Sequence, residues 1–425
     1  MSHRKLLSVG PLLCIGLLLA APMHAADDVP DPNPSLLTLP AAANAPAPDI
    51  IKPGTRLVYY GQSASIPGAG KQLVPEYDKE KQRWVIKGGG GAGFREEEIP
   101  GAAGAGFSVV TVGHVDRKRV TLVTRSYLYD VQDKTSNYSG TTAMVTNAGM
   151  AADYWVNPQV LAKVEEMDQD GVNIMRMPYV LNNRKFNAIR FQVKSNSGHQ
   201  AYVYDLDRGL MIFFSASAQG GSVLTAPVGG DKVGVGKGST MLANGWIMEV
   251  KQVDTPWLEA RTPRWVGQFR KLRYQGTTTM TVPNVGSFPR DVVLDITPKA
   301  RGDNWLRSQS DLTIYNKPVG GQPVPPEQYS NALASGPGCV MGLWIPPDAM
   351  GKLEQGQTLE TNDVTQTKTV VSEIGQGYVT LTEFGKKHRI DMAYDTTTGI
   401  LRGMQVHQQT GLGTTTVRVG LTGQQ

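Results

Sequence analysis

Apolar and polar residues alternate with a period of two in several parts of the chain. The segments 189–194 and 417–421 both show this alternation, which is typical of strands with one buried and one exposed face. Residues 210–214 are apolar throughout, which predicts a strand that is buried on both faces. Low charge and many glycines, prolines and threonines also favour strands joined by turns over long helices. We therefore predict a mainly β protein with antiparallel sheets.

Two Trp-x-x-Pro segments predict one short helix each. They read Trp155-Val-Asn-Pro158 and Trp344-Ile-Pro-Pro347. Asn157 is a suitable N-cap, and a proline at the first helical position loses no hydrogen bond. Core packing is the simpler role for each tryptophan, and a platform for stacking a ligand is the alternative. The apolar residues that follow at helical spacing are Val160, Leu161, Val164 and Met167 in the first segment, and Ala349, Met350 and Leu353 in the second.

A second shared motif, Tyr-Asp-x-x-x-Gly, predicts a hairpin in each half of the chain. It occurs at Tyr204–Gly209 and again at Tyr394–Gly399. The aspartate side chain can accept from backbone amides in the turn, and glycine provides a positive φ. Asp205 and Asp395 are therefore interpreted as turn residues, with a catalytic role as the alternative.

The shared motifs follow one another in the same order, which predicts a duplicated domain. The offsets between copies differ by one residue for the Trp-x-x-Pro and hairpin motifs. A weaker match, 57–61 against 272–276, opens each copy. The fold predicted from this repeat is two tandem antiparallel curved sheets, each half-barrel-like and each with one short helix.

The predicted organisation has five parts. Residues 1–25 read as a signal peptide, because basic residues precede a short apolar run and small residues follow it. Residues 26–49 are a Pro/Ala-rich spacer. The two β domains occupy residues 50–228 and 263–425, with a connector at 229–262, and Trp246 lies in a segment that could be a strand of either copy. A Gly/Ala-rich segment at 88–106 reads as a loop insertion in the first copy.

The second hairpin, Tyr394-Asp395-Thr396-Thr397-Thr398-Gly399-Ile400-Leu401, resembles the Tyr-Asp-x-x-Thr-Gly-x-Leu turn of exported proteins with LolA-like or lipocalin-like half-barrels. The first copy lacks the threonine before Gly209. The resemblance covers about ten residues per copy. It implies a strongly curved sheet around an apolar cavity, with a helix at its mouth, and it assigns no binding residues.

Composition and spacing exclude several classes of chemistry. The formal net charge is +5, of which Arg4 and Lys5 contribute two, and this small excess does not indicate a nucleic-acid-binding protein. Cys339 is the one cysteine outside the signal region and has no neighbouring basic partner, so we expect a buried, inert thiol. None of the four histidines outside the signal region has a metal-ligand spacing: His114, His199, His388 and His407. His199 and His388 precede the two hairpins and are expected to be solvated histidines at strand ends. We expect no metal, no cofactor and no recognisable catalytic motif.

The leading hypothesis is an exported, non-catalytic binding or carrier protein for an apolar small molecule or a partner segment, periplasmic or extracellular, without a transmembrane segment in the mature chain. Methionines near the first helix suit an adaptable apolar surface. The candidate apolar ligand or core residues are Trp155, Leu161, Met167, Met175, Met177, Trp344 and Met350. A basic strip could contact anionic lipid or polysaccharide through Arg264, Lys271 and Arg273, or could protect an edge strand from aggregation. The alternatives are an assembly protein of the bacterial envelope that docks on other proteins and an enzyme with an unrecognised site.

Overall fold

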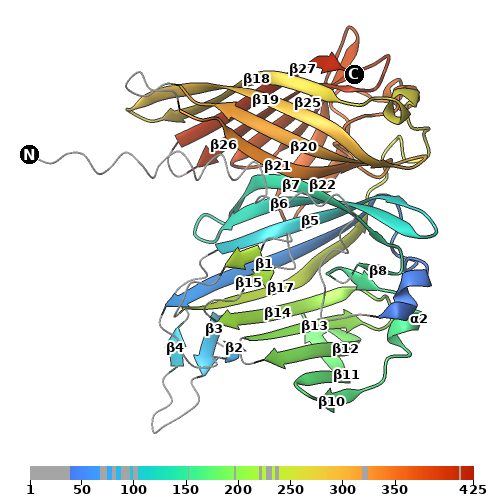
Figure 1. Cartoon of the computed structure of the whole chain (residues 1–425), viewed down its shortest axis with the longest axis vertical. Helices are drawn as coiled ribbons and strands as arrows, with labels where there is room; N and C mark the ends of the chain where they lie inside the picture. Colours follow the sequence, from blue (N-terminus) through green and yellow to red (C-terminus); the bar gives the residue numbers. More distant parts are fainter. Residues whose placement is uncertain are drawn as a thin grey trace, which may run out of the picture.

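The chain folds into two β lobes, each built around one curved antiparallel sheet (Figure 1). The computed structural model describes residues 39–67, 74–78, 83–87, 96–98, 104–151, 153–195, 198–219, 223–225, 232–234, 239–317, 324–410 and 413–425. The predicted signal peptide lies outside these residues, as does most of the 88–106 insertion. The prediction of a mainly β fold with two sheets and two short α-helices is confirmed.

The first lobe contains a sheet of 12 strands. In spatial order these are β10 (Met167–Gln169), β11 (Val172–Leu181), β12 (Arg184–Ser195), β13 (Gly198–Asp205), β14 (Met211–Gln219), β17 (Ser239–Gln252), β1 (Thr55–Pro67), β5 (Gly104–Val115), β6 (Arg119–Asp130), β7 (Thr135–Asn147), β8 (Met150–Ala151) and β9 (Trp155–Val156). Two small sheets accompany it: β2 (Val74–Asp78), β3 (Arg83–Lys87) and β4 (Glu96–Glu98) form one, and β15 (Val223–Thr225) and β16 (Lys232–Gly234) the other.

The second lobe contains a sheet of 10 strands. In spatial order these are β21 (Glu327–Ser335), β20 (Leu306–Tyr315), β19 (Gly286–Arg301), β18 (Leu272–Val282), β27 (Gly413–Gln424), β26 (Leu401–Thr410), β25 (His388–Asp395), β24 (Tyr378–Phe384), β23 (Thr367–Gly375) and β22 (Thr358–Asn362).

The two sheets share one topology. The spatial order of the strands from β7 to β10 in the first sheet matches the order from β21 to β22 in the second, strand for strand. In each sheet the opening strand of the copy pairs with the closing strand: β1 with β17, and β18 with β27. The small sheets β2–β4 and β15–β16 are additions to the first copy. The strand order therefore supports the duplication that the sequence motifs predict.

The strand order also places two segments differently from the sequence analysis. Trp246, in a segment that the sequence allowed as a strand of either copy, belongs to β17 of the first sheet, although it falls within the predicted connector 229–262. Part of the predicted spacer is folded as well. Residues Pro40–Asn44 form a short 3-10 helix (η1), and Ala42 is buried against the first core. Alanine and proline pack there without hydrophobic periodicity, so the pattern gave no signal.

Each predicted helix is present, but each is only one turn long. Helix α2 spans Pro158–Leu161 and α3 spans Pro347–Met350. Asn157 caps α2 as expected, accepting from the backbone N–H of Gln159 at 2.9 Å. The helical register does not continue to Met167, which begins β10 and is 45% exposed. The guanidinium of Arg176 donates to the carbonyls of Ala162 and Val164, which satisfies the end of this short helix.

The two hairpin motifs have matching geometry. The backbone N–H groups of Val156 and Ile345 donate to the carbonyls of Gly209 and Gly399 at 2.9 Å each. Both glycines have positive φ (75° and 77°), and a Cβ on either would lie 2.0–2.1 Å from a carbonyl of the paired Trp-x-x-Pro segment. Only glycine fits such a position. These contacts explain why the two motifs recur together, because the hairpin glycine and the Trp-x-x-Pro segment are directly hydrogen-bonded in each lobe.

The tyrosine of the weaker opening match is also equivalent in the two lobes. The hydroxyl of Tyr59 donates to the carbonyl of Met211, and that of Tyr274 to the carbonyl of Leu401, at 3.1 and 2.9 Å. Both tyrosines are almost fully buried in the core of their own lobe. Among the described residues, no helix is long and apolar enough to cross a membrane.

Candidate ligand cavity between the lobes

Strand β6 of the first lobe contributes side chains to two separate apolar clusters, because one of its faces packs inside its own lobe and the other packs against the second lobe. Val120 and Leu122 point into the first core, whereas Val123 packs with Ala334 and Cys339 of the second lobe. The adjoining strand β7 contacts β21, β20 and β26 of the second sheet. Figure 1 shows β6 and β7 lying directly beneath the second sheet. The first lobe therefore forms a wall across the open side of the second half-barrel.

A cavity of about 150 Å³ lies between this wall and the second sheet. The second lobe contributes an apolar surface with three methionines, Met341, Met392 and Met404. Ile390 and Val406 also line the cavity; both are buried, yet neither belongs to the packed core around Trp344. A pocket of this volume can hold a benzene-sized molecule.

The cavity has one polar region, supplied largely by the first lobe. Arg125 on β6 and Tyr138 and Thr141 on β7 line it, together with Ser310 and Asn331 of the second lobe. The guanidinium of Arg125 lies 5.7 Å from the ring centre of Tyr138, over its face. An apolar hollow with a few converging polar groups is the usual composition of a small-molecule site.

Arg125 forms a buried ion pair across the lobe interface. Its Nη1 lies 2.5 Å from Oε2 of Glu383 on β24, and the two side chains are only 14% and 3% exposed. The other oxygen of Glu383 accepts from the Tyr127 hydroxyl at 3.0 Å and from Nε2 of His388 at 3.2 Å. Burial alone would raise the pKa of Glu383, but Arg125 and these hydrogen bonds outweigh it and lower the pKa. The carboxylate is therefore ionised and fully engaged.

Nδ1 of His388 accepts from the backbone N–H of Tyr138 at 3.2 Å. With Nδ1 as an acceptor, Nε2 carries the proton and donates to Glu383. The expectation of a solvated histidine at a strand end is wrong for this residue, since its side chain is fully buried. Strand position alone could not reveal this, because the covering groups come from the other lobe.

Other polar contacts fix the orientation of the two lobes. Arg56 on β1 is fully buried and bonds Glu249 of its own lobe and Glu360 of β22, the latter at 2.6 Å. Lys387 reaches Asp130 and Asp133 at 3.1 and 2.8 Å. Side chain-to-backbone bonds add to these, including Gln408 to the carbonyl of Tyr138. The cavity wall is thus held in one position by charged and neutral groups from several strands.

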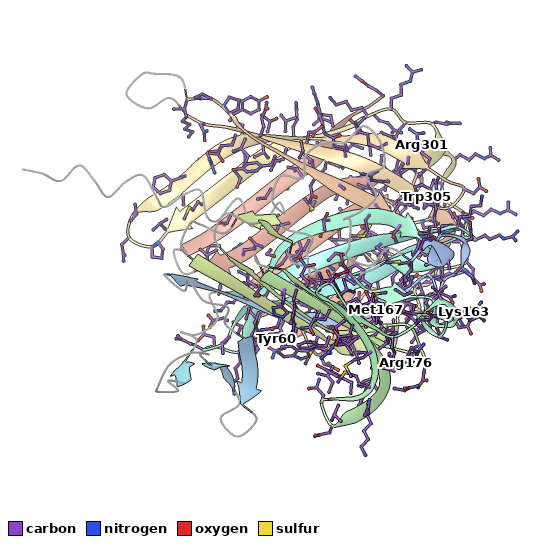
Figure 2. The ribbon with its side chains drawn as sticks, turned by 60° about the horizontal axis from the view of Figure 1, so that its bottom comes forward. Tyr60, Lys163, Met167, Arg176, Arg301 and Trp305 are labelled. Atoms are coloured by element: carbon purple, nitrogen blue, oxygen red, sulfur yellow. The ribbon has the colours of Figure 1, made fainter. Side chains whose placement is uncertain are left out.

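None of the residues chosen from the sequence as apolar ligand candidates lines this cavity. Four of them are buried in the lobe cores: Trp155 and Leu161 in the first, Trp344 and Met350 in the second. Met167 and Met175 lie on the surface of the first lobe, 45% and 36% exposed, and Met177 is half-buried beside them. Figure 2 shows Met167 on the same lobe as Lys163 and Arg176. Of the cavity methionines, Met392 lies on β25 and Met404 on the neighbouring β26, whereas Met341 comes from the segment before α3, so no single sequence pattern marks the three as a group.

The basic strip is partly neutralised in the folded protein. Lys271 and Arg273 both pair with Asp295 on β19, at 2.7 and 2.8 Å. Arg264 lies exposed in a short 3-10 helix, η2 (Arg264–Gly267). A contact of these three residues with an anionic surface remains a prediction.

The remaining features considered in the sequence analysis are the Cys339 thiol and potential metal-binding groups. Cys339 is buried at the lobe interface, and burial raises the pKa of its thiol to about 12, so the thiolate is not accessible at neutral pH. Within the described part of the chain, no group of three or more His, Cys, Asp or Glu residues could hold a metal ion.

No family model and no curated protein matches this sequence. Among solved structures, the chain is similar to one described as "The Structure of Intact Ap-TbpB (N and C lobes)", with 9% sequence identity over 90% of this chain and 79% of that chain. The TM-score is 0.13, which is too low to carry an argument about fold or function. The LolA-like or lipocalin-like resemblance of the hairpin is therefore still a prediction about the family.

Proposed function

We propose that this protein is an exported, non-catalytic binding protein that holds a small apolar molecule in the cavity between its lobes. The observation that carries the proposal is the apolar cavity of about 150 Å³ under the wall formed by β6 and β7. A hollow with a mostly apolar lining and a few converging polar groups is the usual form of a small-molecule site.

The lining supports an adaptable site. Methionine is unbranched and polarisable, so three methionine side chains can adjust to ligands of somewhat different shape. Export is supported by the signal-like residues 1–25.

Calorimetric titration with benzene tests the proposal on the full chain. Substituting Val406→Phe places a ring in the cavity, whereas Ile374→Phe adds the same ring at a position that is 41% exposed. We expect the wild type and Ile374→Phe to bind benzene alike. Val406→Phe should weaken binding at least about tenfold, because ligand and ring cannot share the space.

A second variant, Met392→Phe, fills the cavity from the neighbouring strand. If Val406→Phe loses benzene binding only because it misfolds, a folded Met392→Phe still tests whether filling the cavity excludes the ligand. Thermal unfolding shows whether each variant is folded. Absence of benzene binding to the wild type, or equal binding to the wild type and a folded cavity-filling variant, would overturn the proposal.

A further inference from the structure

The polar end of the cavity indicates what kind of molecule fits. The side chains of Arg125, Tyr138 and Thr141 approach the cavity from the first lobe, opposite the methionines of the second. A ligand held there has its apolar part against the second sheet and one end against the first lobe. The hydrogen-bonding state of each polar group then determines which end group the site can accept.

Most polar side chains that line the cavity, from either lobe, already form a hydrogen bond with a neighbouring group. Asn331 donates to the carbonyl of Thr141 at 2.5 Å and accepts from the backbone N–H of Ala332 at 2.8 Å. The Tyr138 hydroxyl bonds that of Thr141 at 2.8 Å. Apart from Arg125, the remaining polar side chains that line the cavity bond backbone groups: Ser310, Ser335 and Tyr274. These side chains stabilise the cavity lining and have their main hydrogen-bonding groups occupied.

Arg125 differs because it has more donors than partners. A guanidinium carries five N–H donors, and within the described residues Arg125 has one ion-pair partner, Glu383, which lies next to its Nη1. Its side chain is 14% exposed and lines the cavity. Unused N–H groups of a charged donor at the edge of an apolar hollow are strong donors for an incoming oxygen.

The charges around Arg125 exclude an anionic partner for those donors. Glu383 balances the positive charge of Arg125, and Nδ1 of His388 already accepts from the backbone N–H of Tyr138. The ion pair therefore has no net charge. A second carboxylate would bring an uncompensated negative charge into a buried site, which is strongly unfavourable.

From these contacts we infer that the cavity selects an uncharged, compact apolar molecule with one hydrogen-bond-accepting oxygen, such as a ketone, and that Arg125 donates to this oxygen. The inference rests on the proposed function, because it assigns the ligand class of the same cavity. Arg125 acts as the specificity-determining residue, and the methionine-lined surface provides the apolar contact.

Three ring compounds of similar size test the inference: cyclohexane, cyclohexanone and cyclohexanecarboxylate, each titrated into the full chain at pH 7.5 and followed by calorimetry. We expect cyclohexanone to bind at least about tenfold more tightly than cyclohexane, as one hydrogen bond to a charged donor allows. The carboxylate should bind more weakly than either. Preference for the carboxylate, or equal binding of cyclohexane and cyclohexanone, would overturn the inference.

The variant that assigns the selectivity to Arg125 is the pair Arg125→Met with Glu383→Gln, which removes both charges and avoids leaving either one buried alone. It should lose the preference for cyclohexanone. The matched control is Arg389→Met with Asp391→Asn, which removes a more exposed ion pair of the same sheet and should keep the preference. A preference that survives in the Arg125 pair variant contradicts the role of Arg125. If no ring compound binds the wild type, the proposed function itself fails, which is a different outcome from binding without selectivity.

Discussion

Removing one partner of the buried ion pair at the lobe interface should destabilise the protein far more than removing one at the surface. Glu383→Gln leaves the charge of Arg125 without a counter-ion at a site where the two side chains are 14% and 3% exposed. Breaking a buried pair in this way costs about 3–5 kcal/mol. The new amide also presents an NH₂ group where the carboxylate accepted from Tyr127 and His388.

The matched control is Asp133→Asn, since Asp133 pairs with Lys387 across the same interface but is 62% exposed. Exposed pairs contribute about 0–1 kcal/mol. For a lobe of this size, the difference corresponds to a lowering of the unfolding temperature by roughly 10 °C for Glu383→Gln and by less than about 4 °C for Asp133→Asn.

Differential scanning calorimetry at pH 7 measures both variants directly, and partial restoration by Arg125→Met in the Glu383→Gln background tests the coupling of the pair. Equal unfolding temperatures of the two single variants would refute the reasoning, because they would show that solvent reaches Arg125 and Glu383 as freely as it reaches Asp133.

Three further predictions concern other groups. Because the pKa of Glu383 is lowered, the ionised carboxylate contributes to stability above its ordinary pKa of about 4.5, and this contribution is lost as the pH falls further. The difference in unfolding free energy between wild type and Glu383→Gln, measured by urea titration, should therefore shrink below about pH 4. Asp153 behaves oppositely: burial raises the pKa of this half-buried residue to about 7, and among the described residues its Oδ1 has no hydrogen-bond partner. Asp153→Asn should therefore be more stable than wild type at pH 8 and equal to it at pH 3, measured by thermal unfolding. Gly209→Ala and Gly399→Ala should each lower stability in denaturant titrations by more than the about 1–2 kcal/mol expected for Gly356→Ala, because Gly356 shares the positive φ but its Cβ would meet no neighbour.

The features that could be predicted from the sequence are those that depend on local contacts. Asn157 and Pro158 start a helix through interactions within one turn, and Asp395 accepts from the backbone N–H groups of Thr397 and Thr398 inside its own hairpin. The repeat was visible because Gly209 and Gly399 face the same steric demand in both lobes. Such constraints act within a few residues or recur in both copies, so they leave a pattern in the chain.

The cavity could not be predicted for the opposite reason. Arg125 and Glu383 are more than 250 residues apart, and neither has a neighbour in sequence that marks it as buried. The methionines near the first helix attracted attention because they are close together in sequence, whereas Met341, Met392 and Met404 meet only after the second sheet curves. The sequence left open which copy the Trp246 strand belongs to. In the structure β17 pairs with β1, which is distant in sequence, and with β14, from which a glycine-rich segment separates it.

A crystal of the full chain exposed to xenon gas under pressure would test the ligand site most directly, because xenon enters dry apolar voids and scatters strongly. We expect one xenon atom near Met392, Met404 and Val406, with Arg125 at the edge of its site. Collapsed side chains or ordered water in that volume, with xenon absent from it, would contradict the claim that the lobes enclose an apolar binding site.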